Sequence, residues 1–149
     1  MPVEVARRGA GKRVPTRPLK KIAEAILDSV GRKDADLSLA LVGNAEMRRL
    51  NAAYRKKDYP TDVLSFPIDG APLSAGRLLG DVVISVDKAR EQATQRGGTE
   101  HDEIVTLLIH GIVHLLGYDH ERSAKDARAM KRLENKIRGA LCERELLQV

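Results

Sequence analysis

The stretch 110–120, which reads HGIVHLLGYDH, is the part of the sequence most able to do chemistry. His110 and His114 are four residues apart, so on a helix they lie one above the other and both imidazoles can reach a single ion. Gly117 can end that helix in a left-handed turn, which would bring His120 back toward the same face. Three histidines with no fourth protein ligand nearby are typical of zinc that keeps an open position for water or substrate. We therefore expect one zinc ion per chain, held by His110, His114 and His120.

A single histidine on an apolar helix face is more often a hydrogen-bonded core residue than a ligand. Two histidines at helical spacing, followed by a glycine and a third histidine, are harder to explain in that way. Buried imidazoles without partners would cost free energy. His101 falls in the first turn of the same predicted helix, and we expect it at the surface.

The spacing also matches the long zinc-protease signature HExxHxxGxxH except at one position, where Gly111 replaces the general-base glutamate. Without that glutamate, peptide hydrolysis by a zinc-bound water lacks its usual proton acceptor. The difference argues against a protease. We also expect the small Gly111 to leave room beside the metal for a larger substrate.

The elements that must position these residues follow from hydrophobic periodicity, which predicts an α+β fold: a small mixed sheet of about four strands packed with about five helices. Asn44 and Asp87 are expected to cap the second and third helices. Pro67 suggests the end of a strand or an edge position. The predicted strands cover 2–8, 37–41, 61–67 and 81–86, and the predicted helices cover 17–30, 44–54, 88–96, 99–116 and 123–145.

The helix that carries the first two histidines resembles the site helix of zinc hydrolases. Thr99 opens it, and Asp102 completes an acidic variant of the capping box. From 104 to 116 it is apolar almost all round, which predicts burial. Its polar exceptions, Thr106 and the two histidines, share one face.

Composition indicates a soluble globular protein, and we expect a single domain over 1–149. The net charge of +5 favours an anionic partner, with nucleic acid the first candidate. Only four residues are aromatic, which argues against a platform that stacks several bases. The single cysteine, Cys142, excludes an internal disulfide and a cysteine-rich zinc site, and it fits a reducing cytoplasm. No apolar run approaches the length that spans a bilayer.

The full string at 110–120 resembles the signature of the YbeY family, the metal-dependent endoribonucleases of bacterial rRNA maturation. Two further blocks are similar to that family: LNAAYR over 50–55 with PTDVLSFP over 60–67, and GDVVIS over 80–85. The resemblance runs in the same order from about residue 39 to residue 141. The basic N-terminal segment is the part that it supports least.

The resemblance implies a zinc-dependent, single-strand-specific endoribonuclease that acts in 16S rRNA 3′-end maturation and late ribosome quality control. It also implies that Arg55 is the family's essential arginine. On chemical grounds alone, a guanidinium can grip a phosphate and stabilise charge as the scissile oxygens become more negative, although a solvated surface charge is the simpler alternative. The implied partners are single-stranded RNA, rRNA, the small ribosomal subunit and assembly factors, in the cytoplasm.

Several alternatives remain open from the residues. Asp119 could orient a histidine, hold the turn before His120 or accept a proton, and we favour the first two roles. Asp62 could pair with an arginine or begin a strand. The attacking group could be water or the 2′-hydroxyl of the RNA. Rival functions are a zinc hydrolase of another class, such as a peptidase, and a non-catalytic ribosome-assembly factor with a structural zinc.

Overall fold

The computed structural model describes residues 3–67, 78–118 and 123–147. In these ranges the chain forms a four-stranded sheet, five α-helices and one short 3-10 helix, which confirms the predicted α+β architecture. The elements in chain order are β1 (Val3–Arg7), η1 (Gly9–Arg13), α1 (Thr16–Ser29), β2 (Asp36–Val42), α2 (Asn44–Arg55), β3 (Val63–Pro67), β4 (Leu78–Ser85), α3 (Val86–Arg96), α4 (Glu100–Leu115) and α5 (Ala124–Glu143).

The sheet is mixed, with the strand order β1-β2-β4-β3. Strands β1, β2 and β4 run parallel, and β3 pairs with β4 in the antiparallel direction at one edge. The nearly continuous apolar strand β4 is therefore interior, as its composition indicates. Pro67 ends the edge strand β3, where its missing N–H disturbs the ladder least.

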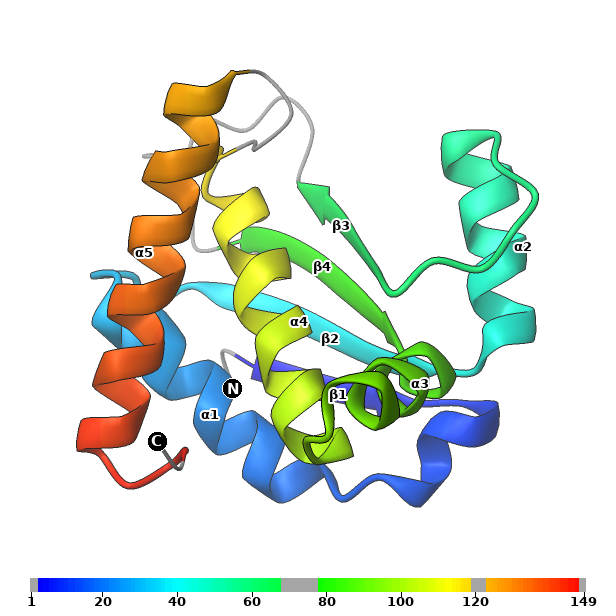
Figure 1. Ribbon diagram of the computed structural model, residues 1–149, viewed down its shortest axis with the longest axis horizontal. Helices are drawn as coiled ribbons and strands as arrows, with labels where there is room; N and C mark the ends of the chain where they lie inside the picture. The colour runs from blue at the N-terminus through cyan, green and yellow to red at the C-terminus, as the bar shows by residue number, and fades with distance from the viewer. Residues whose placement is uncertain (1–2, 68–77, 119–122, 148–149) are drawn as a thin grey trace.

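The two faces of the sheet are covered unequally. Alternate residues of β2, Leu37, Leu39 and Leu41, face the main core, which also contains side chains of α1, α4 and α5. Val42 belongs instead to a small second core with Met47 of α2. Figure 1 shows α4 lying across the sheet beside α5, while α2 stands apart from both.

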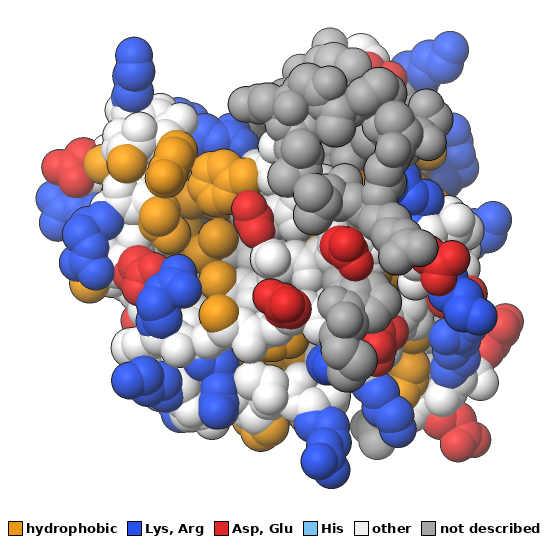
Figure 2. Space-filling model, turned by 180° about the vertical axis from the view of Figure 1, so that it is seen from behind, with side chains coloured by type: hydrophobic (Ala, Val, Ile, Leu, Met, Phe, Trp, Pro, Cys, Tyr) orange, Lys and Arg blue, Asp and Glu red, His pale blue; other side chains and the backbone are white. Residues whose placement is uncertain are grey.

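The second face of the sheet carries an apolar groove of about 650 Å³ beside α2. Tyr54 of α2 and Phe66 of β3 line it, with ring centroids 5.2 Å apart in an edge-to-face arrangement. Figure 2, the view from behind, shows hydrophobic side chains gathered on one part of this side and Lys and Arg side chains around them.

Helix α4 is buried on nearly every side because it packs against β3, β4, α1, α3 and α5. Thr99 caps it as predicted, since the Thr99 hydroxyl accepts a hydrogen bond from the Asp102 N–H at 3.1 Å. Although α4 is apolar, no helix in the described ranges combines the length and hydropathy that a membrane crossing requires.

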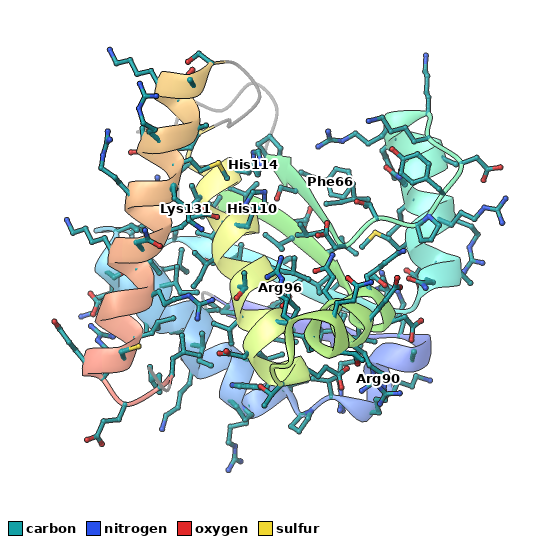
Figure 3. The ribbon with its side chains drawn as sticks, in the orientation of Figure 1. Phe66, Arg90, Arg96, His110, His114 and Lys131 are labelled. Atoms are coloured by element: carbon teal, nitrogen blue, oxygen red, sulfur yellow. The ribbon has the colours of Figure 1, made fainter. Side chains whose placement is uncertain are left out.

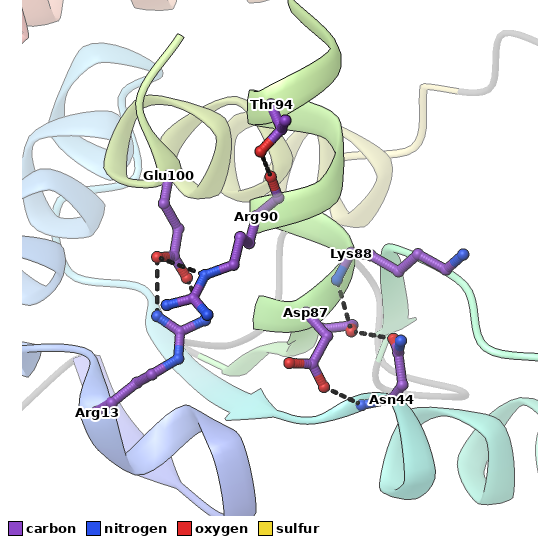
Figure 4. Close-up of polar contacts among 8 residues, drawn as sticks. Arg13, Asn44, Asp87, Lys88, Arg90, Thr94 and Glu100 are labelled. Atoms are coloured by element: carbon purple, nitrogen blue, oxygen red, sulfur yellow. Dashed lines mark hydrogen bonds and ion pairs between the residues drawn. The ribbon is translucent and has the colours of Figure 1, made fainter. Parts of the chain in front are cut away.

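The predicted caps of α2 and α3 are wrong, because Asp87 serves the start of α2 and Ser85 caps α3 (Figure 4). Gly43 holds the N-cap position of α2, and the Asn44 N–H donates to the Asp87 carboxylate at 2.9 Å. Ser85 caps α3, with its hydroxyl oxygen accepting from the Lys88 N–H at 3.2 Å. The same hydroxyl donates to the Asn44 side-chain oxygen at 2.8 Å. Asp87 therefore stabilises the start of the neighbouring helix and not of its own, which local sequence could not indicate.

Candidate functional site

His110 and His114 lie on successive turns of α4 (Figure 3), as their spacing predicts. Their ring centroids are 4.7 Å apart, and the ring planes meet at 77°. Both residues are half-buried, and both line the same pocket. Two imidazoles this close on one helix face suit a shared ion.

Glu134 of α5 is a site residue that the sequence analysis missed. Its Oε2 atom lies 2.9 Å from His110 Nδ1. Burial by itself would raise the pKa of Glu134, but the hydrogen bond from His110 and the electrostatic influence of neighbouring side chains, Lys131 among them, outweigh it and keep that pKa below its ordinary value. The ionised carboxylate thus accepts the Nδ1–H, so Nε2 is the nitrogen of His110 suited to bind an ion.

A signal for Glu134 did exist in the sequence. Met130, Ile137 and Leu141 form the buried stripe of α5, and Glu134 falls within that stripe, four residues after Met130 and three before Ile137. A carboxylate in an apolar stripe needs a partner. Nothing in the local pattern showed that the partner is a histidine of another helix.

Gly111 does not leave room for substrate, so that expectation is wrong. A Cβ atom at Gly111 would lie 2.7 Å from Val82 Cγ1 and 3.3 Å from Ser65 Oγ. The glycine faces the sheet and allows α4 to approach β3 and β4 closely. Ser65 donates a hydrogen bond to the Gly111 carbonyl at 3.0 Å, which ties the site helix to β3. A glutamate could not occupy this position without displacing α4 from the sheet.

Helix α4 ends as predicted in a left-handed turn at Gly117, whose φ is 101°. The Gly117 N–H donates to the His114 carbonyl, and the Tyr118 N–H donates to the Val113 carbonyl, which is the Schellman pattern. Asp119 and His120 lie outside the described residues. Within the part of the chain that the structure describes, no group of three His, Cys, Asp or Glu residues could hold a metal ion. Among the described residues, the groups that could take part in a metal site are the two imidazoles and the Glu134 carboxylate hydrogen-bonded to His110. Two imidazoles, one of them oriented by a carboxylate, fit a zinc site.

A pocket of about 390 Å³ brings the C-terminal end of α2 to the two histidines. Arg55, at the end of α2, lines it together with Lys57, His110 and His114, and β3 forms another part of its wall. The Arg55 side chain is exposed, and it makes no hydrogen bond or ion pair with another described residue. An arginine that is 55 positions from His110 in sequence therefore faces the same cavity, where it can meet a bound anion.

Asp62, at the edge of this pocket, has a structural role. Its Oδ1 atom accepts a hydrogen bond from the Val63 N–H at 2.8 Å, at the start of β3. Its Oδ2 atom accepts from the Gln92 side chain at 3.1 Å. Of the two alternatives left open by the sequence, the strand-start role fits, and the side-chain partner is a glutamine.

The other residues singled out in the sequence lie away from this pocket. His101 is exposed in the first turn of α4. Tyr118 is half-buried and packs against the main core. Cys142 is a half-buried residue of α5 that also packs there. None of the three lines the pocket of His110 and His114.

Comparison with known proteins bears directly on this arrangement. The family model described as "Endoribonuclease YbeY" matches residues 5–141. The protein named endoribonuclease YbeY from Aquifex aeolicus is 44% identical to this chain, and the match covers 85% of this chain and 83% of the relative. The protein of the same name from Geobacter metallireducens is 40% identical, and the match covers 97% of this chain and 98% of the relative. A solution structure of a Thermotoga maritima protein matches with a TM-score of 0.65 at 27% identity, over 96% of this chain and 91% of that one.

These matches extend the likeness toward the N-terminus, since the family model begins at residue 5 and so includes most of β1. They also confirm the resemblance noted from the histidine motif and its two companion blocks. On the family match and on these relatives, the chain belongs to the YbeY family of endoribonucleases.

Proposed function

We propose that this chain is a zinc-dependent endoribonuclease that cleaves single-stranded RNA in the pocket between α2 and α4. The observation that supports it best is that Arg55 and the His110–His114 pair line one cavity. Family membership supplies the RNA-cleaving activity. The pocket supplies what a phosphodiester needs, which is a pair of ion-binding imidazoles and a cation without a protein partner among the described residues.

His110 and His114 would hold the ion, with His120 as the third ligand. Glu134 fixes the ring of His110 by accepting its Nδ1–H, which sets the tautomer and makes Nε2 a better donor. When bound, zinc supplies a Lewis acid and lowers the pKa of a water molecule toward neutrality.

Arg55 acts on the phosphate. Its guanidinium can donate two parallel hydrogen bonds to non-bridging oxygens, and it stays charged throughout the reaction. The developing negative charge is greatest in the transition state, so this contact accelerates the reaction and does not merely hold substrate.

The position of Gly111 supports RNA over peptide as the substrate. In the zinc-protease motif this place belongs to the glutamate that accepts the proton from water. Here the corresponding space is filled by Val82 and Ser65 of the sheet, so the proton must leave by another group. Whether water or the 2′-hydroxyl of the RNA attacks, its proton would be accepted by a group other than residue 111.

In the cell we propose that the enzyme acts on rRNA, in 16S rRNA 3′-end maturation and late ribosome quality control, with the small ribosomal subunit and assembly factors as partners in the cytoplasm. The net charge of +5 supports an anionic partner of this kind. Residues 1–149 would act as a single domain.

The test compares metal-free protein, zinc-loaded protein and the Arg55→Ala variant on single-stranded and duplex RNA. We expect cleavage of the single strand by the zinc-loaded protein only, and a loss of about 10²- to 10³-fold in Arg55→Ala. Arg49→Ala is the matched control, because Arg49 is also exposed on α2 but lines a different part of the surface. Equal cleavage by metal-free protein would overturn the zinc-dependent mechanism.

A further inference from the structure

The segment between α2 and β3 is held in a defined path. Lys56, with a φ of 57°, ends α2 in the left-handed region and turns the chain back along the helix. Asn51 then fixes the segment at two points: its carbonyl accepts from the Lys57 N–H at 3.3 Å, and its side-chain N–H donates to the Tyr59 carbonyl at 2.8 Å. Asn51 is only 2% exposed, so these bonds are shielded from water.

A second anchor holds the same segment from the outside. Arg48 of α2 makes a two-point ion pair with Asp58, with Nε 2.8 Å from Oδ1 and Nη2 3.1 Å from Oδ2. The hydrogen bond from Arg48 lowers the pKa of the Asp58 carboxyl below its ordinary value. Asp58 is therefore directed toward α2, away from the pocket of the histidines.

The consequence is an alternation along the segment. Arg55, Lys57 and Tyr59 line the pocket, whereas Lys56 and Asp58 do not. The left-handed turn at Lys56, together with the anchors at Asn51 and Arg48, directs these side chains to one wall of the pocket. Two cations and an aromatic ring thus form one row at the wall that faces His110 and His114.

Tyr59 is the unexpected member of this row. Its side chain is 52% exposed, and its ring and hydroxyl have no stacking or hydrogen-bond partner among the described residues. Tyr54 is similarly exposed at 66%, but its ring contacts Phe66 in the groove on the other face of the sheet. Tyr59 therefore presents an uncovered aromatic face at the rim of a polar pocket, where a base can stack on it.

We propose that Tyr59 stacks on one base beside the scissile phosphate while Lys57 contacts a neighbouring phosphate, so that the pocket selects an unpaired nucleotide. This inference rests on the proposed function, whose pocket it shares. In a duplex both faces of a base are covered by its neighbours, so the Tyr59 ring has nothing to stack on. Because every base has an aromatic face, the contact selects single strands without reading sequence.

The test measures binding of a fluorescent single-stranded RNA to zinc-loaded protein by anisotropy, with the RNA checked for intactness by gel. Tyr59→Ala should weaken binding by about 5- to 150-fold, the usual value of one stacked base. Tyr59→Phe keeps the ring and should bind like the parent protein. Tyr54→Ala is the matched control and should also bind like the parent, since Tyr54 lines the other groove.

A substrate change identifies the partner of the ring. One abasic nucleotide is moved along the RNA, and at one position it should weaken binding by the parent protein as much as Tyr59→Ala does. At that position Tyr59→Ala should lose nothing further, because the stacked pair is already absent. Additive losses at every position, or normal binding by Tyr59→Ala, would refute the proposal.

The role of Lys57 is tested by comparing how RNA binding depends on salt concentration in variants of Lys57 and of its neighbour Lys56. Lys57→Gln should reduce the slope of log K against log salt concentration by about 0.7, the value for one phosphate contact on a single strand. Lys56→Gln removes the same charge from a residue that does not line the pocket, and it should change the slope by less than half as much. Equal changes in the two variants would contradict a specific Lys57 contact.

The outcome also separates this inference from the function on which it rests. Suppose that RNA is cleaved normally, but the losses from Tyr59→Ala and from an abasic nucleotide add at every position. This result refutes the stacking contact alone. A non-additive loss at one position, in a protein that cleaves no RNA, supports the stacking contact and refutes the endonuclease mechanism.

Discussion

The Oε2 atom of Glu134 in α5 lies 2.9 Å from the Nδ1 atom of His110 in α4. A side chain of α5 therefore orients an imidazole of α4. This contact joins residues 24 positions apart and crosses the interface between α4 and α5. It makes α5 part of the site, although His110 and His114 themselves lie on α4. A carboxylate behind a ligand histidine normally sets both its tautomer and its ring orientation.

Removing the Glu134 carboxylate should weaken zinc binding. We expect Glu134→Ala to lose about 10- to 100-fold in zinc affinity, measured by competition with a chromophoric chelator. Glu134→Gln still offers an oxygen acceptor and should lose less. Glu143→Gln, a substitution at an exposed position of the same helix, is the control and should leave affinity unchanged. Unaltered affinity in Glu134→Ala would mean that the carboxylate does not support the ligand.

Adding one carbon at Gly111 should destabilise the fold. The new Cβ atom would lie 2.7 Å from Val82 Cγ1, and overpacking of this kind costs about 1–3 kcal/mol. Urea denaturation of Gly111→Ala gives the change in the free energy of unfolding. Removing the Val82 side chain in a double variant with Val82→Ala should recover part of that loss relative to the sum of the single effects.

The replacement Gly139→Ala in α5 should change the free energy of unfolding in the opposite direction. Among the described residues, a Cβ atom at Gly139 would meet nothing within 4 Å outside the backbone of its own helix, so the replacement should stabilise the protein by about 0.5–1 kcal/mol through helix propensity. If both glycine replacements changed stability alike, close packing of α4 on the sheet would not explain Gly111.

The attacking group can be identified from the products. If water attacks, RNA with a 2′-O-methyl group at the cleavage position should still be cut, and the products should contain no 2′,3′-cyclic phosphate. End groups are determined by mass spectrometry of a short oligonucleotide after digestion with zinc-loaded protein. Cyclic phosphate ends, together with resistance of the methylated RNA, would assign the attack to the 2′-hydroxyl.

Asn51 should matter for stability as well as for RNA binding. Asn51→Asp removes the N–H that donates to the Tyr59 carbonyl and places a charge in a buried position, at a cost of about 1–3 kcal/mol. Asn135→Asp makes the same chemical change at an exposed position of α5 and should be nearly neutral. Thermal and urea unfolding measure both variants. RNA binding should weaken in Asn51→Asp under conditions where it remains folded, because the segment that carries Tyr59 loses an anchor.

The sequence by itself determined most of the local structure. The four strands, the five helices and the apolar character of α4 follow from hydrophobic periodicity, and the cap at Thr99 and the turn at Gly117 follow from local residue chemistry. The placement of His110 and His114 on one face also follows from spacing alone, because a helix repeats every 3.6 residues whatever packs around it. Family membership was recognisable from the sequence because the histidine motif is continuous along the chain.

Only the tertiary structure decided what those local elements meet. It joined Glu134 to His110, filled the space at Gly111 with Val82, and gave Asp87 to the start of α2. It also brought Arg55 and Tyr59 to the pocket of the histidines. The physical reason is that these contacts depend on how helices and strands pack, and packing is set by the whole core. Spacing along the chain indicates which face a side chain shares, but not which residue lies opposite it.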